Sequence, residues 1–256
     1  MCLILFAWKM HENFPLILTA NRDEFYARPT APAAFWEDAP GLLAGRDLRE
    51  GGTWLGITRK GSLAALTNYR DPATLKDGAP SRGKLVSDFL RGRRTPKAYL
   101  HWLSPRAARY NGFGLLVGNP DELYYFSNRG TPICLLPGIH GMSNHLLDTP
   151  WPKVERGKQA LGGLLEREKA PSPEALLDLL ADRSRPPDDR LPVTGVGLEW
   201  ERVLSPLFIE SPLYGTRSST VLIIDRKGRT TFVERVFKSE PDPWMTSRFD
   251  FRIIQT

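Results

Sequence analysis

The chain has 256 residues, of which 41% are hydrophobic and 25% charged, with 35 Lys and Arg against 29 Asp and Glu, for a net charge of +6. This composition excludes disordered and collagen-like chains, and the length allows one large domain or two small ones. The longest apolar run, residues 1–8, is too short for a membrane helix and lacks the features of a signal peptide. We therefore expect a soluble, cytoplasmic protein without an integral membrane segment.

The first third of the chain has the pattern of β-strands. Strand-forming residues stand in apolar runs separated by polar or glycine-containing turns, at residues 2–8, 15–20, 53–58 and 62–67. Lys60-Gly61 between the last two runs is typical of a hairpin. Residues 51–56 are rich in glycine but lack the order and the lysine of a phosphate-binding loop, so we interpret these glycines as points of close backbone approach near a site.

The rest of the chain alternates helical and strand patterns. A helical block comes first, over residues 84–91 and after Thr95-Pro96 and Ser104-Pro105, each of which is typical of an N-cap followed by the first helical residue. The elements predicted after it are strands at 113–118, 123–127 and 133–136, helices from Thr149-Pro150 to about Lys169 and from Ser172-Pro173 to Leu180, and final strands at 219–225 and 230–237.

The order strands, helices, strands, helices, strands indicates the α+β class. It favours two stacked, mainly antiparallel sheets with one helical block outside each, which is a four-layer αββα sandwich. A generic α+β domain gives much the same order, so this architecture is one of two that the pattern allows.

The positive charge is concentrated in one stretch. Residues 81–110 carry eight Lys and Arg against Asp88, so the remainder of the chain is nearly neutral. The stretch has no zinc-finger spacing and no RNA-binding aromatic motif, and we interpret it as a solvated helical face rather than a nucleic-acid surface. Contact with an anionic ligand or the periphery of a membrane stays open.

Two cysteines cannot build a disulfide framework, and they invite different interpretations. If Met1 is removed, Cys2 would carry a thiol and a free α-amine, which supply a nucleophile and a base on one residue. The alternative is that Cys2 begins a buried strand as a small apolar side chain. Cys134 lies within Ile-Cys-Leu-Leu and is predicted to be in the core.

Polar residues at the ends of predicted strands are the candidates for the rest of a site. Asp23 would orient the amine of Cys2, and Arg22 would stabilise its thiolate, although neighbours on a strand point to opposite faces. Asn68 and Asn144 could donate to an oxyanion, with Arg217 as a partner of the substrate or nucleophile. The alternatives are a salt-bridged strand end, turn-forming Asn residues and a surface Arg.

Other chemistry is not indicated. The four His residues show no zinc-ligand spacing, and Cys-x-x-Cys, a Walker loop and a dinucleotide-binding fingerprint are absent from the sequence. We therefore expect no metal site and no required cofactor.

These motifs resemble the transport and Golgi organisation protein 2 family, also called the NRDE family after Asn21-Arg22-Asp23-Glu24. The matching segments follow the family's order over nearly the whole chain: residues 1–3, 20–26, 28–29, 43–47, 51–56, 67–70, 81–83, 110–113, 127–129, 143–144, 147–153 and 214–220. The resemblance implies a single domain over residues 1–256, with a fold similar to that of N-terminal-nucleophile (Ntn) hydrolases.

The resemblance also implies two functions. Cysteine amidases of similar fold suggest an amide hydrolase that uses Cys2, with Arg22, Asp23, Asn68, Asn144 and Arg217 as the other catalytic residues. The family's link to haem trafficking and acyl lipids suggests instead a protein that binds and hands over an amphipathic anion, first haem and then an acyl-CoA-like lipid. Residues that would suit such a ligand are Asn21, Glu24, Arg46, Trp54 and Trp151, together with Arg22, Arg217 and Trp8.

Overall fold

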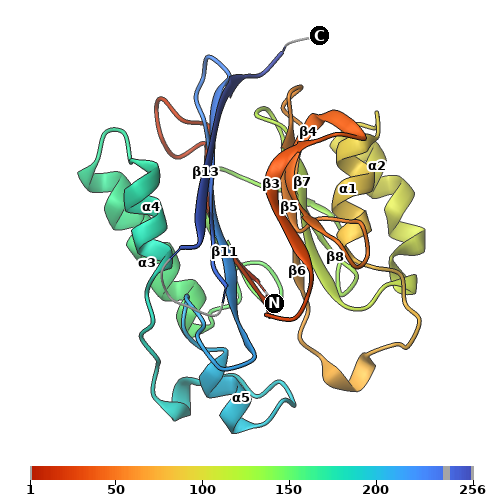
Figure 1. The fold of residues 1–256 in the computed structure, drawn as a ribbon, viewed down its shortest axis with the longest axis vertical. Helices are drawn as coiled ribbons and strands as arrows, with labels where there is room; N and C mark the ends of the chain where they lie inside the picture. The colour runs from red at the N-terminus through yellow and green to blue at the C-terminus, as the bar shows by residue number, and fades with distance from the viewer. Residues whose placement is uncertain (1, 239–242, 255–256) are drawn as a thin grey trace.

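Two antiparallel sheets lie face to face, each covered on its outer side by helices (Figure 1). The computed structural model describes residues 2–238 and 243–254, and of Cys2 it describes the backbone alone. The layer order is helices, sheet, sheet, helices, so the α+β class and the four-layer αββα sandwich predicted from the sequence are confirmed.

Sheet A brings together both ends of the chain. Its strand order is β10-β1-β2-β11-β12-β13, so β2 and β11 lie at its centre. The bounds of these strands are β1 Cys2–Trp8, β2 Leu16–Phe25, β10 Gly138–Met142, β11 Tyr214–Ile224, β12 Arg229–Val236 and β13 Met245–Arg252. The register pairs Cys2 with Arg22 across β1 and β2, and Arg22 with Ser218 across β2 and β11.

Sheet B is formed by one continuous stretch of the chain. Its strands follow the chain order β3-β4-β5-β6-β7-β8-β9, so β3 and β9 are its edges. The bounds are β3 Thr30–Trp36, β4 Ala39–Asp47, β5 Leu55–Thr58, β6 Leu63–Asn68, β7 Phe113–Gly118, β8 Leu123–Ser127 and β9 Ile133–Cys134.

Strands β1, β2 and β11 of sheet A are buried on both faces over most of their length, which explains their long apolar runs. Side chains alternate in direction along a strand, so Ile4 and Phe6 of β1 face sheet B, whereas Leu3 and Leu5 face the helices. The core therefore has a central layer between the sheets and an outer layer under each pair of helices.

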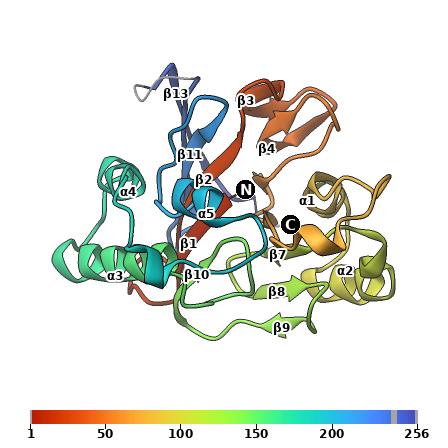
Figure 2. The same ribbon diagram turned by 90° about the horizontal axis from the view of Figure 1, so that it is seen from below.

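The helices are placed as predicted, one block outside each sheet (Figure 2). Helices α1 (Gly83–Arg91) and α2 (Pro96–Leu103) cover sheet B, and α3 (Pro152–Arg167) and α4 (Pro173–Leu180) cover sheet A. The caps predicted for α2 and α4 are present, because the hydroxyls of Thr95 and Ser172 accept hydrogen bonds from the third backbone N–H that follows each.

Two predicted helix starts were wrong. Helix α3 begins at Pro152, after Trp151 as its N-cap, because the Thr149 hydroxyl bonds the His145 ring instead of the helix. Ser104-Pro105 opens a 3₁₀ helix, Ser104–Arg109, because the Ser104 hydroxyl donates back to the Leu100 carbonyl and caps nothing.

Several elements were not predicted from the pattern. Strands β3 and β4 contain Pro32, Pro40 and Gly41, which break the strand signal, and an edge strand such as β3 tolerates proline. Strand β13 alternates charged and aromatic residues, and its Phe249 and Phe251 pack on the central core. The short helix α5, Leu198–Val203, follows a proline-rich loop.

The prediction that Cys134 lies in the core was wrong. Cys134 stands in β9, a two-residue edge strand of sheet B, and is exposed. The apolar run was misleading because only Leu135 turns inward, while Ile133 and Leu136 are exposed as well.

Candidate functional site

Arg22 links the two sheets at one end of the sandwich. It lies near the end of β2, is only 6% exposed, and its guanidinium stacks 4.2 Å from the ring centroid of Trp54, which precedes β5 of sheet B. Its Nη1 has no hydrogen-bond partner within the described part of the chain. Because a buried guanidinium normally uses its donors, this atom is available to a ligand.

A polar pocket of about 230 Å³ lies on one side of the Arg22–Trp54 stack. Its walls carry both signs of charge, with Arg22, Arg28 and Arg82 against four acids, Asp23, Glu24, Asp47 and Glu50. Arg28 is already committed to Asp47, with 2.6 Å between Nη2 and Oδ2. This polar pocket also includes Asn68, so it gathers five of the residues predicted for catalysis or binding: Arg22, Asp23, Glu24, Trp54 and Asn68.

A second pocket, of about 180 Å³, shares Arg22 and Trp54 with the polar pocket, and we call it the cationic pocket. Three cations line it, Arg22, Arg217 and Lys238, together with one acid, Glu234. The remaining walls include the aromatic rings of Trp54, Phe237 and Trp244 and the apolar residues Ala31, Pro32 and Val236. Aromatic and cationic groups together suit an anion with an apolar body.

Arg22 and Arg217 repel each other across the cationic pocket. Burial lowers the pKa of Arg217, and the charge of Arg22 lowers it further. Arg217 donates from Nη1 to the carbonyls of Phe25 and Arg28, but its Nε is buried without a hydrogen-bond partner among the described residues. Two close guanidinium groups with unused donors are typical of an anion site.

Glu234 is buried in the wall of the cationic pocket. It stands on β12 and is 1% exposed, and its Oε1 accepts a 2.6 Å hydrogen bond from the Ala33 backbone N–H. Burial raises the pKa of Glu234 to about 7, although the Ala33 hydrogen bond, Arg22 and Ser218 oppose the shift. Glu234 was not predicted from the sequence. Phe232, Glu234 and Val236 alternate toward the inner face, and an acid in such an apolar series indicates a site.

The backbone of Cys2 lies directly beside the site. Strand β1 begins at Cys2, which pairs with Arg22 in the antiparallel register. The side chain of Cys2 lies outside what the structure describes, so its predicted role as a nucleophile stays a prediction. What the described backbone fixes is that the chain begins its first strand at the residue opposite Arg22.

The side chains of Asp23 and Arg22, two neighbours on β2, have different partners. Asp23 is buried, and its Oδ1 accepts a 2.8 Å hydrogen bond from the Thr216 hydroxyl. Burial raises the pKa of Asp23, and Lys153 and the Thr216 hydrogen bond partly offset this. Arg22 turns instead to Trp54, so the two side chains diverge as their adjacency on a strand predicts, while both still line the polar pocket.

Asn68 and Asn144 are linked through the backbone. The Asn144 amide donates a 3.1 Å hydrogen bond to the Asn68 carbonyl, and its oxygen accepts one from Arg70. Arg70 in turn forms a buried ion pair with Glu201 of α5, with 2.5 Å between Nη1 and Oε2. Asn144 is therefore hydrogen-bonded to the last residue of β6. Of the two asparagines, only Asn68 lines the polar pocket.

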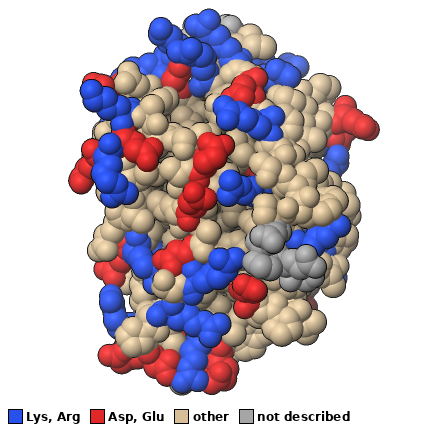
Figure 3. All heavy atoms as spheres, turned by 60° about the vertical axis from the view of Figure 1, so that its left-hand side comes forward, with Lys and Arg blue, Asp and Glu red and all other residues tan. Residues whose placement is uncertain are grey.

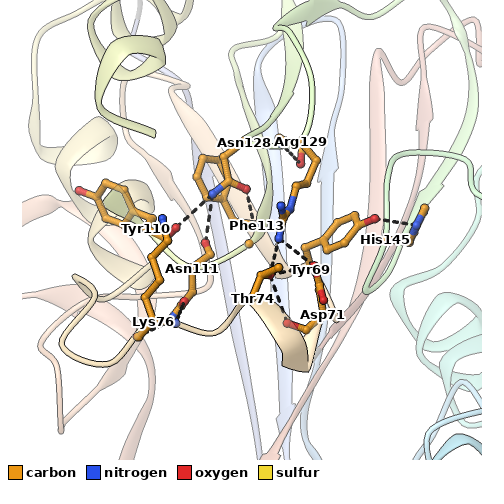
Figure 4. A network of polar contacts seen from close by, with 12 residues as sticks. Tyr69, Asp71, Thr74, Lys76, Tyr110, Asn111, Phe113, Asn128, Arg129 and His145 are labelled. Atoms are coloured by element: carbon orange, nitrogen blue, oxygen red, sulfur yellow. Dashed lines mark hydrogen bonds and ion pairs between the residues drawn. The ribbon is translucent and has the colours of Figure 1, made fainter. Parts of the chain in front are cut away.

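The loop after Asn68 is fixed by a network of polar contacts (Figure 4). Tyr69 Oη lies 2.8 Å from Nε2 of His145, and Arg129 forms an ion pair with Asp71. Asn128 bonds the backbone N–H of Phe113 and three nearby carbonyls, of which one belongs to Asn111. Asn111 also lines the polar pocket, so this network gives that wall a fixed position.

The other predicted binding residues have structural partners. The Asn21 amide donates to the carbonyls of Leu180 and Leu207 on the helical side of sheet A. Arg46 pairs with Asp38 and stacks on Trp36 on the outer side of sheet B. Trp151 lies beside Arg70 and His145, and Trp8 is in the central core. Of the three tryptophans, Trp54 alone is placed at the two pockets, and the binding roles of Asn21, Arg46 and Trp151 stay predictions.

The glycine-rich segment before β5 also borders the polar pocket, as the sequence predicted. A Cβ on Gly52 would lie 2.5 Å from the backbone carbon of Gly83, at the start of α1. Gly83 and the next two residues of the segment, Thr53 and Trp54, line the pocket. The close approach of two glycines therefore lets helix α1 reach the site.

Metal and membrane features are not seen in the described residues. Within residues 2–238 and 243–254, there is no group of three His, Cys, Asp or Glu residues that could hold a metal ion. No helix of that part is long and apolar enough to cross a membrane. On the face that bears α3 and α4, acidic and basic side chains are interspersed (Figure 3).

Comparison with solved structures identifies the fold. An N-acylethanolamine-hydrolyzing acid amidase ortholog from Caenorhabditis elegans superposes with a TM-score of 0.51 at 12% identity, over 87% of this chain and 92% of that one. The C2A mutant of the conjugated bile acid hydrolase from Clostridium perfringens gives 0.50 at 8% identity, over 100% and 98%. Both are Ntn hydrolases, and at this identity the likeness shows that the chain shares their fold.

Comparison by sequence identifies the family. The family model described as Transport and Golgi organisation 2 matches residues 1–239. The chain is 40% identical to the transport and Golgi organization protein 2 homolog of Bos taurus over 277 residues, with 99% of each chain covered. The corresponding human protein is 37% identical, also with 99% of each chain covered. The chain therefore belongs to the transport and Golgi organisation 2 family and has the fold of the Ntn hydrolases.

Proposed function

We propose that the protein binds and hands over a small amphipathic anion, and that the cationic pocket holds the anionic group. The observation that carries this proposal is the pair Arg22 and Arg217, two guanidinium groups that repel each other and keep buried donors unused. An anion between them would remove the repulsion and accept both donors.

The apolar part of the ligand would lie against the aromatic walls. Trp54 and Phe237 are partly or fully buried, whereas Trp244 is 54% exposed at the opening. The polar and cationic pockets share Arg22 and Trp54, and together their volumes fall within the range of roughly 300–1,000 Å³ that is usual for small-molecule sites. A ligand could therefore extend past the Arg22–Trp54 stack from one pocket to the other.

Haem is the first candidate ligand, and an acyl-CoA-like lipid is the second. Haem carries two propionates on an apolar ring, which matches two separate guanidinium groups beside aromatic side chains. An acyl-CoA joins phosphates to an apolar chain and would use the same cations. Neither ligand needs to be held permanently, because its charged groups would be bound by side chains and not by a covalent bond.

Titration with haem and, separately, with palmitoyl-CoA tests the proposal. Saturable binding is expected, with an affinity at least about tenfold weaker in Arg22→Gln and in Arg217→Gln, since a hydrogen bond to a charged group contributes about 1.5–3 kcal/mol. Arg229→Gln is the matched control, because Arg229 is exposed, pairs with Asp225 and lines neither pocket. Binding that never saturates, or that is indifferent to both substitutions, would contradict the proposal.

A second candidate function is cysteine amide hydrolysis. It is favoured by the register that sets Cys2 opposite Arg22, at the polar pocket that Asp23 and Asn68 also line. In this reaction the Cys2 thiolate would attack an amide carbonyl to form a thioester, with release of the amine, and water would then hydrolyse the thioester to a carboxylic acid.

A screen of N-acyl amino acids tests the second function. Turnover and an acyl adduct on Cys2, seen by mass spectrometry, are expected in the unaltered protein and absent in Cys2→Ala. The control is Cys134→Ala, since Cys134 is exposed in a different sheet. Turnover that survives Cys2→Ala would reject Cys2 as the nucleophile.

A further inference from the structure

Glu234 is a buried carboxyl group with one oxygen that no described residue satisfies. Its Oε1 is bonded to the Ala33 backbone N–H, whereas its Oε2 has no partner of normal hydrogen-bond geometry within the described residues. Ser218 acts as a weak hydrogen-bond donor that lowers the pKa of Glu234, but its geometry is too poor for a normal hydrogen bond to Oε2. An unsatisfied buried carboxyl oxygen is costly and calls for an explanation.

The surroundings of Glu234 explain why it does not form an ion pair. From β2 the nearby charge is Arg22, whose guanidinium is stacked on Trp54. From β11 the pocket has Arg217 and Ser218, and beyond β12 it has Lys238. On β3, the Ala33 backbone N–H faces Glu234, and on β13 the residue paired with Glu234 is Ser247. The described charged groups around Glu234 are thus three cations, none of which forms an ion pair with it, and the other groups are neutral.

We propose that Glu234 is a third ligand-binding residue of the cationic pocket and acts in its protonated form, with Oε2–H donating a hydrogen bond to the anion held by Arg22 and Arg217. This inference rests on the proposed function and names the state in which that site binds. The ligand is then taken up together with one proton, because an ionised Glu234 would repel the anion and compete with it for Arg22.

The direction of the pH effect follows from linkage. Burial sets the pKa of Glu234 at about 7 in the empty site, and a bound anion raises it further, so binding takes up a proton. If only the protonated form binds, the affinity falls about tenfold between pH 6 and pH 8. The pocket therefore favours ligands with an anionic oxygen that can accept a hydrogen bond, such as carboxylates, phosphates and sulfonates.

Fluorescence titration with anilinonaphthalenesulfonate tests the inference, because this amphipathic sulfonate keeps one charge from pH 6 to pH 8. The unaltered protein should bind it about tenfold more weakly at pH 8 than at pH 6. Glu234→Gln keeps a neutral donor at the same place, so its affinity should not depend on pH. Glu166→Gln, on an exposed position of α3, makes the same chemical change and should behave like the unaltered protein.

The outcomes separate this inference from the proposed function. Binding that depends on Arg22 and Arg217 but is equal at pH 6 and pH 8 would overturn the role of Glu234 alone. So would a Glu234→Gln protein that keeps the full pH dependence. Absence of saturable binding at every pH would overturn both.

Infrared difference spectroscopy gives a readout of Glu234 itself. The spectrum of the unaltered protein should show a protonated carboxyl C=O band that Glu234→Gln lacks. At pH 8 this band should appear when the sulfonate is added. A band that is absent at pH 6, or that does not respond to the ligand, would contradict proton uptake by Glu234.

Discussion

Arg22 of sheet A and Trp54 of sheet B stack at 4.2 Å, so one cation–π contact joins the two halves of the sandwich at the site. The same two side chains line both the polar pocket and the cationic pocket. A ligand in either pocket therefore touches both sheets, and its binding should stabilise their packing against each other.

The buried ion pair Arg70–Glu201 should be essential for stability. Either Arg70→Met or Glu201→Gln leaves one partner buried without its charge complement, at a cost of about 3–5 kcal/mol in the free energy of unfolding. Urea denaturation measures this. The exposed pair Arg202–Asp188 is the control, and Asp188→Asn should change the free energy of unfolding far less than either buried substitution. Equal losses for the buried and exposed pairs would show that this account of the ion pair is wrong.

Gly52 should not tolerate a side chain. The Cβ of Gly52→Ala would lie 2.5 Å from the Gly83 backbone, so helix α1 must shift, and we expect a loss of about 1–3 kcal/mol in stability. Thermal denaturation followed by circular dichroism checks this. Gly41→Ala, where nothing lies within 4 Å of the new Cβ, should change stability by less than about 0.5 kcal/mol. A Gly52→Ala protein as stable as Gly41→Ala would refute the close approach.

Asn21 should act through stability. Its amide bonds the carbonyls of Leu180 and Leu207, and its oxygen accepts from Ser219, so Asn21→Ala leaves several buried groups unpaired. We expect a loss of more than about 2 kcal/mol in the free energy of unfolding. The exposed Asn13→Ala should be nearly neutral. If Asn21 binds the ligand, as the sequence suggested, affinity will fall in the folded fraction of Asn21→Ala, and titration at low temperature distinguishes the two roles.

Two histidines should titrate on opposite sides of the ordinary pKa of 6.5. The hydrogen bond to Asp148 raises the pKa of His140, whereas burial lowers the pKa of His145. Proton NMR of the ring signals measures both. Asp148→Asn should lower the pKa of His140 and leave His145 unchanged, and an unchanged His140 would argue against the Asp148 contact.

The pH dependence of stability follows from the same shift. Because the folded pKa of His140 lies above the unfolded value, its protonated form stabilises the fold fully below about pH 6.5, and that stabilisation is lost as the pH rises through the folded pKa. His140→Gln should therefore lower the melting temperature at pH 5.5 more than it lowers the melting temperature at pH 8.

The alternation of apolar runs was sufficient to predict the layers, because strands buried on both faces and amphipathic helices each leave a strong local pattern. It failed for β13, where the solvent-facing Arg248 and Asp250 alternate with Phe249 and Phe251, and for β3, whose single proline, Pro32, is tolerated only at an edge. Those properties depend on the position of a strand in its sheet, which a local pattern does not contain.

The candidate site was predicted only in part, because a local pattern shows polar residues beside apolar runs but not which strands meet in the fold. Arg22 and Arg217 lie within β2 and β11, which extend beyond the predicted apolar runs, and they were recognisable as polar residues next to those runs. Glu234 was not recognised, because its pocket is formed with Ala31 and Pro32 of a strand that the pattern missed. The partners of Asn21 and Arg46 lie on elements distant in the sequence or on the outer face, and only the fold reveals them.

The topology has a consequence for synthesis on the ribosome. Sheet B is complete once the chain has reached Cys134, whereas sheet A needs β11, β12 and β13 from the last part of the chain. Until those strands emerge, β2 lacks its neighbour β11 and leaves an unpaired apolar edge that invites aggregation. Nascent chains of this protein should therefore depend on chaperones mainly between the completion of sheet B and release, and a truncation before Tyr214 should be soluble only with such help.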